Sequence, residues 1–241
     1  MSLVETDWLE KNINNVKIID CSWHMPQAKR DGLQEYKNQH IPGAIFFDLD
    51  NNSKKNTKLP HMLVEINEWE KIVSQMGIKK ENKIVIYDNS DVISSCRCWF
   101  NFIYFGHDPA LVHVLKVELT KWIKENRKIT KEIISIQKSD YKSFEKKELV
   151  KNKKQIDLNI EEQHFKVIDA RSKERFEGKV SEPRKGLRSG SIKDSFCIPC
   201  NQCINEEKTF KSKEDLEVVF EVCLKNINEK DVVFSCGSGV T

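Results

Sequence analysis

The sequence predicts an α/β fold in which mainly parallel strands carry helices on both faces of the sheet. Two observations predict it. Short β-branched runs alternate with helix-length segments along the 241-residue chain, and part of this pattern recurs in the second half. Parallel strands need long crossover connections, which are usually helices, so this alternation is typical of a parallel sheet. The recurrence indicates that one α/β unit is present twice.

The strands of the first half are expected where β-branched and aromatic residues concentrate. They cover 16–19, 45–47, 84–87 and 111–115. Helix-length segments between and after these strands cover 69–76, 98–105 and 118–126. Gly77 and Gly106 directly follow the first two of these segments, and glycine is a common stop signal at a helix C-terminus.

Two segments of the first half return in the second half at almost the same offset. Residues 16–22 align with 165–171, which lie 149 positions later, and 84–90 align with 232–238, which lie 148 positions later. The second alignment puts Cys236 where the first copy has Asp88. We therefore expect the second copy to be the catalytic one and the first copy to act as scaffold.

The repeat also sets the expected domain boundaries. A first domain covers 1–128, a lysine-rich connector covers 129–163, and a second domain covers 164–241. The connector is rich in lysine, with Lys146, Lys147, Lys151, Lys153 and Lys154, and is expected to be a solvated linker and not a binding patch.

Composition excludes several classes of protein. Forty basic residues against thirty-seven acidic ones give a net charge of +3, which is too small and too mixed to argue for nucleic-acid binding. No apolar run approaches the roughly 20 residues that span a bilayer, and the acidic start lacks a signal-peptide pattern. The eight cysteines are irregularly spaced, so we expect reduced thiols in the cytoplasm.

Arginine is rare in this chain and clustered. Only seven arginines occur, and four of them fall within eighteen residues: Arg171, Arg175, Arg184 and Arg188. A guanidinium group binds planar carboxylates and similar anions through two hydrogen bonds, which lysine cannot copy. The alternative is a loop stabilised by salt bridges, because Glu174, Glu177 and Glu182 are interleaved with the arginines.

A cysteine at the end of a predicted strand carries the candidate chemistry. Cys236 follows the run 232–235 and is followed by Gly-Ser-Gly-Val-Thr. Ligands of open α/β sheets bind at the carboxyl ends of the strands. Gly237 and Gly239 let the backbone turn so that successive N–H groups converge on the sulfur and favour its thiolate form. The alternative is a buried structural cysteine before a turn.

Further motifs carry a resemblance to a known family. The first half contains Asp-Cys-Ser-Trp at 20–23, His-Ile-Pro-Gly-Ala at 40–44 and Leu-Pro-His-Met-Leu at 59–63, and the second contains Asp-Ala-Arg-Ser at 169–172 and Glu-Pro-Arg at 182–184. With the terminal loop, they make the chain resemble the two-domain rhodanese-superfamily sulfurtransferases over nearly its whole length. The loop is most similar to that of the 3-mercaptopyruvate type, whereas thiosulfate-type loops carry Arg-Lys after the cysteine.

The resemblance implies a fold and an activity. It implies two rhodanese-like domains, the second one incomplete, because a family member would continue for about forty residues beyond the loop. It implies a sulfurtransferase that moves sulfur from 3-mercaptopyruvate, or thiosulfate, to a thiol or a thioredoxin-like acceptor. The sulfur would be carried as a persulfide on Cys236, with no cofactor.

The resemblance also implies roles for individual residues. Arg175 and Arg184 are expected to bind the carboxylate and keto oxygen of the substrate. The loop residues Gly237, Gly239, Val240 and Thr241 are expected to line the substrate site. Ser238, His40 and Asp31 are expected to form a proton relay. For His40 the alternative is a hydrogen-bonded structural histidine in a turn, and for Asp31 the assignment rests on spacing alone.

Two segments of the second half depart from the family or suggest another chemistry. Residues 191–195 read Ser-Ile-Lys-Asp-Ser where the family repeats His-Ile-Pro-Gly-Ala, and the loss of proline and glycine is expected to soften that turn. Cys197, Cys200 and Cys203 offer only three metal ligands without a further pair, so we expect no metal site there. The family match places this run on a strand and its exit turn.

Two other functions stay open from the sequence. A degenerate persulfide carrier or binding module would keep the fold without turnover, and the early end and the altered turn at 191–195 favour it. A phosphatase of the same fold uses a cysteine, five residues and then an arginine, and that arginine would fall one position beyond Thr241.

Overall fold

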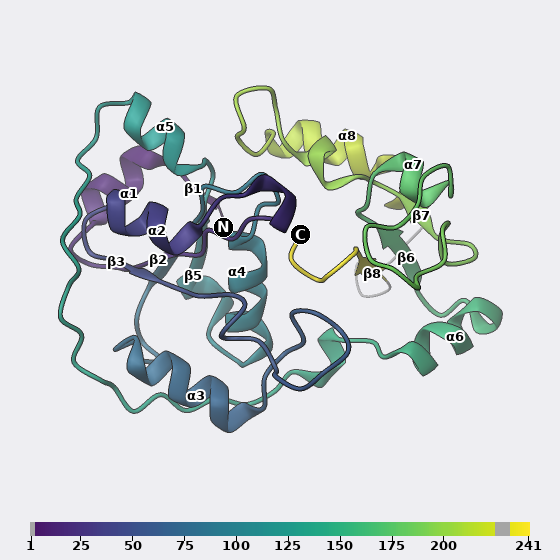
Figure 1. Ribbon diagram of the computed structural model, residues 1–241, viewed down its shortest axis with the longest axis horizontal. Helices are drawn as coiled ribbons and strands as arrows, with labels where there is room; N and C mark the ends of the chain where they lie inside the picture. The colour runs from purple at the N-terminus through teal and green to yellow at the C-terminus, as the bar shows by residue number, and fades with distance from the viewer. Residues whose placement is uncertain (1–2, 225–231) are drawn as a thin grey trace. The chain divides into compact units, whose positions relative to one another are not determined.

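The computed structural model describes residues 3–224 and 232–241, which fold into two compact units (Figure 1). The first unit contains residues 1–149 together with 238–241, and the second contains 150–237. Each unit is built on a parallel sheet with its own hydrophobic core. The predicted α/β class is confirmed.

The first unit has a five-stranded sheet in the order β1-β5-β4-β2-β3, and every neighbouring pair is parallel. Its strands are β1 (Leu3–Val4), β2 (Lys17–Asp20), β3 (Ala44–Phe46), β4 (Ile84–Tyr87) and β5 (Val112–Leu115). Its helices are α1 (Thr6–Asn12), α2 (Gly32–Asn38), α3 (Ile66–Gln75), α4 (Ser95–Tyr104) and α5 (Leu119–Lys124), with short 3-10 turns at Pro26–Ala28, Pro109–Leu111 and Lys147–Leu149.

Alternation of side chains along β2 and β4 gives this sheet a core on each face. Ile19 and Ile86 belong to one cluster, which includes side chains of α3 and α4. Ile18 and Val85 belong to the other, which includes side chains of α1, α2 and α5. Successive strand residues point to opposite faces, so a strand that is apolar throughout is buried on both sides.

The second unit has a three-stranded parallel sheet in the order β7-β6-β8. Its elements are α6 (Lys153–Glu162), β6 (Lys166–Asp169), α7 (Lys173–Phe176), β7 (Phe196–Cys197), the 3-10 turn η4 (Cys200–Cys203), α8 (Lys213–Leu224) and β8 (Val232–Ser235). The core is small: Ile168, Ile198 and Cys223 are its buried members.

The two sheets repeat each other in register, as the sequence alignment predicts. Asp20 pairs with Tyr87 in the first sheet, and Asp169 pairs with Ser235 in the second. The residue after each aspartate continues the ladder, because Cys21 donates its N–H to Tyr87 O at 2.9 Å and Ala170 donates to Ser235 O at 2.7 Å. The order β3-β2-β4 therefore corresponds to β7-β6-β8.

The segment 129–163 differs from the solvated linker expected from its lysines. Its first part packs on the first unit, where Tyr141 is 1% exposed and Thr130 pairs with His40. Its later part forms helix α6, which begins with a capping box between Asn152 and Gln155. The lysine-rich composition does not predict these contacts, because they are made by a few isolated apolar and helix-capping residues.

The turn at 191–195 also differs from expectation, because it keeps the geometry of its counterpart at 41–44. Ala44 donates its N–H to Ile41 O at 3.0 Å, and Ser195 donates to Ile192 O at 3.2 Å. Asp194 has φ +60°, close to the +78° of Gly43 in the first copy. Aspartate is one of the few residues that tolerate the left-handed region, so the turn survives without glycine.

Candidate active site

Cys236 lies directly after β8, at the carboxyl edge of the second sheet. The neighbouring strand β6 ends at Asp169, whose Oδ1 accepts the N–H of Arg171 at 3.0 Å. Asp20 accepts the N–H of Ser22 in the same way in the first copy, at 2.9 Å. The two sheet edges thus share one architecture, and Cys236 stands where the connections leave the sheet.

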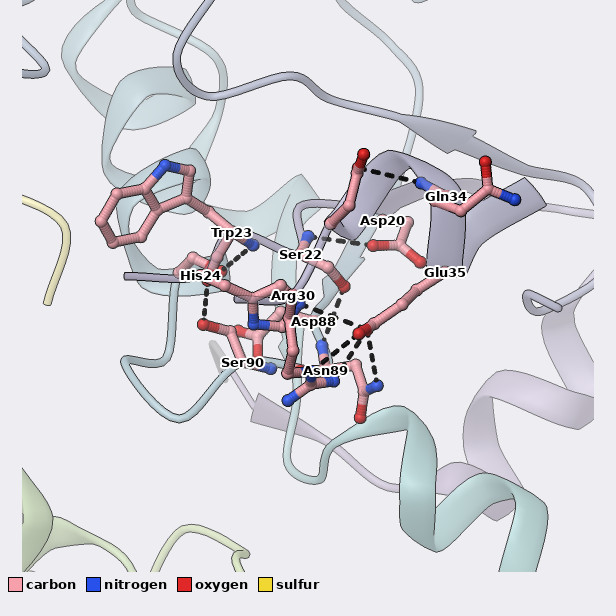
Figure 2. Close-up of polar contacts among 12 residues, drawn as sticks. Asp20, Ser22, Trp23, His24, Arg30, Gln34, Glu35, Asp88, Asn89 and Ser90 are labelled. Atoms are coloured by element: carbon pink, nitrogen blue, oxygen red, sulfur yellow. Dashed lines mark hydrogen bonds and ion pairs between the residues drawn. The ribbon is translucent and has the colours of Figure 1, made fainter. Parts of the chain in front are cut away.

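The counterpart of Cys236 in the first unit holds a carboxylate in a cradle of backbone N–H groups (Figure 2). Asp88 Oδ1 accepts the N–H of Ser90 at 2.9 Å, and its Oδ2 accepts that of Ser95, at the start of α4, at 2.7 Å. Burial raises the pKa of Asp88, and these hydrogen bonds oppose the rise. In the first copy the loop therefore directs N–H groups at the side chain in this position.

Glu182 gathers two of the four clustered arginines. Arg175 donates to both of its carboxylate oxygens, at 3.0 and 2.6 Å, and Arg171 donates to Oε1 at 2.9 Å. Arg175 and then Arg171 lower the pKa of Glu182 from its ordinary value. For these two arginines the structure shows the salt-bridged arrangement that the sequence left as an alternative, while Glu177 pairs with Lys179 instead.

The terminal loop contacts two of the arginines within the second unit. The Arg184 side chain is exposed and donates to Gly237 O. Arg175 lies against the same residue, because a Cβ on Gly237 would be 2.8 Å from Arg175 Nη2. A side chain at 237 would therefore have to displace the end of the Arg175 side chain. Arg188 donates instead to backbone oxygens of Ser189 and Ser191.

The last residues of the loop belong to the first unit. Arg97 Nη1 donates to Gly239 O at 2.6 Å, and Thr241 Oγ1 donates to Val92 O at 3.2 Å. Val240 is 2% exposed, and its side chain packs in the larger core cluster. Gly239 has φ +70°, in the left-handed region that favours glycine. These contacts hold the loop three residues beyond Cys236.

The structure does not join the two residues expected to form the relay with Ser238. His40 is fully buried, and its Nδ1 and Nε2 lie 2.6 and 3.1 Å from the carbonyl oxygens of Tyr36 and Glu132. Asp31 is exposed and caps α2 by accepting the N–H of Gln34 at 3.1 Å. The two residues flank opposite ends of that helix. The geometry of His40 favours the structural alternative.

A different Asp–His pair, which the sequence analysis missed, has the geometry of a relay. His61 Nε2 lies 2.9 Å from Asp50 Oδ1, and Trp23 Nε1 donates to Asp50 Oδ2 at 2.9 Å. Since carboxylates accept, His61 donates from Nε2 to Asp50. Among the described residues Nδ1 is buried without a hydrogen-bond partner.

Backbone strain and a shared arginine link this pair to the terminal loop. His61 has φ +52°, a left-handed conformation that is uncommon outside glycine and concentrates at functional sites. Its carbonyl oxygen accepts a hydrogen bond from Arg97, which also donates to Gly239 O. The sequence signal for His61 is its place in the motif Leu-Pro-His-Met-Leu at 59–63, which carries part of the family resemblance. The resemblance by itself gave this histidine no role.

The cysteine run of the second unit lies on β7 and on η4, as expected for a strand and its exit turn. Within residues 3–224 and 232–241, no group of three or more His, Cys, Asp or Glu side chains is arranged to hold a metal ion. Cys197 Sγ faces Arg171 O at 3.9 Å, and burial raises the pKa of both Cys197 and Cys203.

Comparison with known proteins identifies the family. The model of the rhodanese-like domain matches residues 5–125. The chain is 36% identical over 263 residues to the mitochondrial thiosulfate/3-mercaptopyruvate sulfurtransferase 1 of Arabidopsis thaliana, which covers 99% of this chain and 68% of the relative. It is 31% identical over 248 residues to the 3-mercaptopyruvate sulfurtransferase of Rattus norvegicus, covering 100% and 82%. The crystal structure of SseA from Escherichia coli, one of the 3-mercaptopyruvate sulfotransferases, matches with a TM-score of 0.87 at 28% identity, over 100% of this chain and 90% of that one. The chain therefore belongs to the rhodanese-like family of sulfurtransferases.

Proposed function

We propose that this sulfurtransferase takes sulfur from 3-mercaptopyruvate and carries it as a persulfide on Cys236. The observation that supports this most directly is the placement of Cys236. It follows a strand at the carboxyl edge of the second sheet, and its loop contacts Arg175 and Arg184. The relatives whose alignments cover 99–100% of this chain are named 3-mercaptopyruvate and thiosulfate/3-mercaptopyruvate sulfurtransferases.

Donor binding would use the arginines beside the loop. Arg184 is exposed and has guanidinium donors beyond the one that binds Gly237 O, so it can bind a planar carboxylate. Arg175 stays oriented by Glu182 and brings its charge next to Gly237. Gly237 and Ser238 are uncharged, so the loop lacks the two cations that thiosulfate-type loops carry. We therefore expect a preference for 3-mercaptopyruvate over thiosulfate.

Sulfur transfer then follows two covalent steps. The thiolate of Cys236 attacks the sulfur of 3-mercaptopyruvate, the carbon–sulfur bond breaks, and pyruvate leaves once its enolate carbon is protonated. The acceptor thiol then attacks the outer sulfur and frees the Cys236 thiolate. We assign the proton movement to Ser238, the hydroxyl that follows Cys236 by two positions on the loop.

The acceptor and the compartment are proposed from thiol chemistry. A small thiol or a thioredoxin-like protein can attack a persulfide, and neither needs a cofactor on this chain. None of the eight cysteines forms a disulfide in the structure, which is compatible with the reducing cytoplasm. Among the described residues no helix has the length and apolarity to cross a membrane.

The experiment is a search for the persulfide by mass spectrometry after one turnover with 3-mercaptopyruvate. We expect the wild type to gain one sulfur on the peptide that contains Cys236 and to release pyruvate. The Cys236→Ser variant should do neither, and Cys197→Ser, a half-buried cysteine on β7, should behave as the wild type. A persulfide that persists on Cys236→Ser would overturn the assignment. A wild type that gains no sulfur and releases no pyruvate with 3-mercaptopyruvate, but gains one sulfur on Cys236 from inorganic polysulfide, would support the degenerate carrier instead.

A further inference from the structure

The cysteine run of the second unit contains a pair of thiols that the proposed function does not use. Cys200 and Cys203 are the first and last residues of η4, a single turn of 3-10 helix. The turn is closed by hydrogen bonds from Gln202 N–H to Pro199 O at 2.9 Å and from Ile204 N–H to Asn201 O at 3.2 Å. Neither cysteine is part of a disulfide, and both are of intermediate exposure.

The geometry of a 3-10 turn suits a disulfide between these two positions. Residues i and i+3 lie directly above one another in such a helix, and a rise of about 2 Å per residue separates their Cα atoms by about 6 Å. Disulfide-bonded cysteines have Cα separations of about 4.4–6.8 Å, most often near 6 Å. The Cα separation expected for Cys200 and Cys203 therefore falls within the range of disulfide-bonded cysteines. Burial raises the pKa of Cys203, and the nearby Cys200 raises it further.

The same pair lies on the sheet edge that carries Cys236. Cys200 donates its N–H to Ala170 O at 3.0 Å, and Ala170 donates its own N–H to Ser235 O at 2.7 Å. Ser235 is the residue before Cys236. Two backbone hydrogen bonds thus lead from the dithiol, across the end of β6, to the cysteine of the terminal loop, all within the second unit.

The separation agrees with the reach of a sulfur atom passed between two cysteines. Two strand spacings of about 4.8 Å place the Cα atoms of Cys200 and Cys236 about 10 Å apart. A disulfide spans up to about 6.8 Å between Cα atoms, and one additional sulfur of about 2 Å extends this to about 9 Å. A shift of the loop by about 1 Å would bring the outer sulfur of a Cys236 persulfide to Cys200.

We propose that Cys200 and Cys203 form a redox-active dithiol that takes the sulfur from Cys236 and releases it as hydrosulfide. This inference rests on the proposed persulfide at Cys236 and names an acceptor within the chain itself. The dithiol would make the protein a source of sulfide when no external thiol is bound. A dithiol reductant of the thioredoxin class then restores it.

The steps balance in atoms and electrons. The Cys200 thiolate attacks the outer sulfur of the Cys236 persulfide, whose S–S bond breaks, and Cys236 leaves as a thiolate. Cys203, after losing its proton to solvent, attacks the Cys200 sulfur and displaces hydrosulfide. The transferred sulfur is thereby reduced by two electrons, and the two cysteine thiols supply them as they form a disulfide. The external dithiol returns those two electrons in a later exchange.

The first experiment tests the dithiol without any sulfur donor. The full chain is equilibrated in buffers of reduced and oxidised glutathione, quenched in acid, alkylated and mapped by mass spectrometry. We expect a disulfide between Cys200 and Cys203 at a lower proportion of oxidised glutathione than for any other cysteine pair. If these two cysteines remain alkylatable thiols throughout, or pair with other partners, the proposal is wrong.

The second experiment counts products with 3-mercaptopyruvate in the absence of added thiol. The wild type should release two pyruvates and one sulfide per chain, because Cys236 is emptied once and then loaded again. Cys200→Ser should release one pyruvate and no sulfide. Cys203→Ser should release two pyruvates and no sulfide, because the sulfur stays on Cys200. Cys197→Ser is the matched control in the same segment and should give the wild-type counts.

The outcomes separate this inference from the proposed function. Sulfide release from the Cys200→Ser, Cys203→Ser double variant at the wild-type level would overturn the dithiol. So would one pyruvate and no sulfide from the wild type, which would still leave Cys236 as the sulfur carrier. Absence of pyruvate from every variant would contradict only the proposal that 3-mercaptopyruvate is the sulfur donor. Cys236 would then be loaded with inorganic polysulfide instead, and the sulfide released by each variant would again test the role of Cys200 and Cys203.

Discussion

Single residues of the first unit acquire a role through contacts that are distant in the sequence. Trp23 donates to Asp50, which pairs with His61. Arg97 donates to the carbonyl oxygens of His61 and of Gly239, and Gly239 lies 142 positions after Arg97. His61 is left with a buried Nδ1 that has no hydrogen-bond partner among the described residues. A buried nitrogen without a partner costs stability, so its retention favours a functional reason.

His40 should contribute to folding and not to catalysis. We expect His40→Gln to destabilise the fold by about 1–3 kcal/mol, because it disturbs a fully buried side chain with two carbonyl partners. Thermal unfolding and steady-state kinetics of this variant provide the measurement. A His40→Gln variant of normal stability that has lost its activity would return His40 to the proton relay.

Arg184 should contribute to donor binding through its planar geometry. We expect Arg184→Lys to raise KM for 3-mercaptopyruvate about tenfold with a smaller effect on kcat, because lysine keeps the charge and loses the paired hydrogen bonds. Arg188→Lys is the matched control, since Arg188 binds backbone oxygens in the same loop. Kinetics with 3-mercaptopyruvate and with thiosulfate decide the matter. Equal KM values in Arg184→Lys and the wild type would show that Arg184 does not bind the donor and only contacts the loop at Gly237.

Elements of the two units keep their geometry even where their residues differ. The turn at 191–195 has Asp194 in the left-handed conformation that Gly43 adopts in the first copy, and both turns close with the same backbone hydrogen bond. The turn type therefore belongs to the repeated unit. The residue in the left-handed conformation, Gly43 in the first copy and Asp194 in the second, decides only how much strain the turn stores.

Substitutions at Asp194 should show that strain. We expect Asp194→Gly to raise the free energy of unfolding by up to about 1 kcal/mol, because glycine adopts positive φ without a Cβ clash. Asp194→Val should lower it by about 1–2 kcal/mol. Lys193→Val tests the neighbouring position, which lies outside the left-handed region, and should change it by less than about 0.5 kcal/mol. Chemical denaturation of the three variants measures these differences, and equal effects of valine at 193 and 194 would contradict the strained turn.

The segment that follows the first sheet should make stability depend on pH. His107 Nδ1 lies 3.0 Å from the Tyr141 hydroxyl, and Nε2 lies 3.0 Å from Asn82 O. Burial lowers the pKa of His107 from 6.5. The unfolded chain therefore binds the proton at a higher pH than the folded one, so stability is complete above about pH 7.5 and falls as the pH drops through 6.5.

The measurement is the thermal midpoint between pH 5.5 and 8. The fall below pH 7 should be smaller in His107→Gln, because that variant has no group to protonate at this site. His164→Gln replaces an exposed histidine and should leave the slope unchanged. An unchanged slope in His107→Gln would show that another group causes the fall.

The whole molecule consists of two units whose cores differ in extent. Ile86 on β4 is fully buried between two neighbouring strands, whereas its counterpart Phe234 on β8 is 62% exposed. In the described residues of the second unit, β8 pairs only with β6. In the described residues the second core has fewer buried apolar side chains, and less burial gives less hydrophobic stabilisation, so we expect the unit that carries Cys236 to be the less stable one.

Hydrogen exchange in the native state should resolve this difference. We expect the amides of β2 and β4 to exchange with a larger opening free energy than the corresponding amides of β6 and β8. Denaturant titration should then show the second unit opening first. Equal opening free energies for both sheets would mean that the two units unfold as one cooperative body, against the expectation.

Local patterns in the chain predict the repeated strands, their register and the place of Cys236 at a strand end, because side-chain periodicity and repeated segments carry that information directly. They do not predict that His61 pairs with Asp50, that Arg97 holds Gly239, or that His40 is buried against two carbonyl groups. Loop conformations and packing between distant segments determine these contacts. They depend on which residues come close in three dimensions, and no periodic pattern in the sequence carries that information.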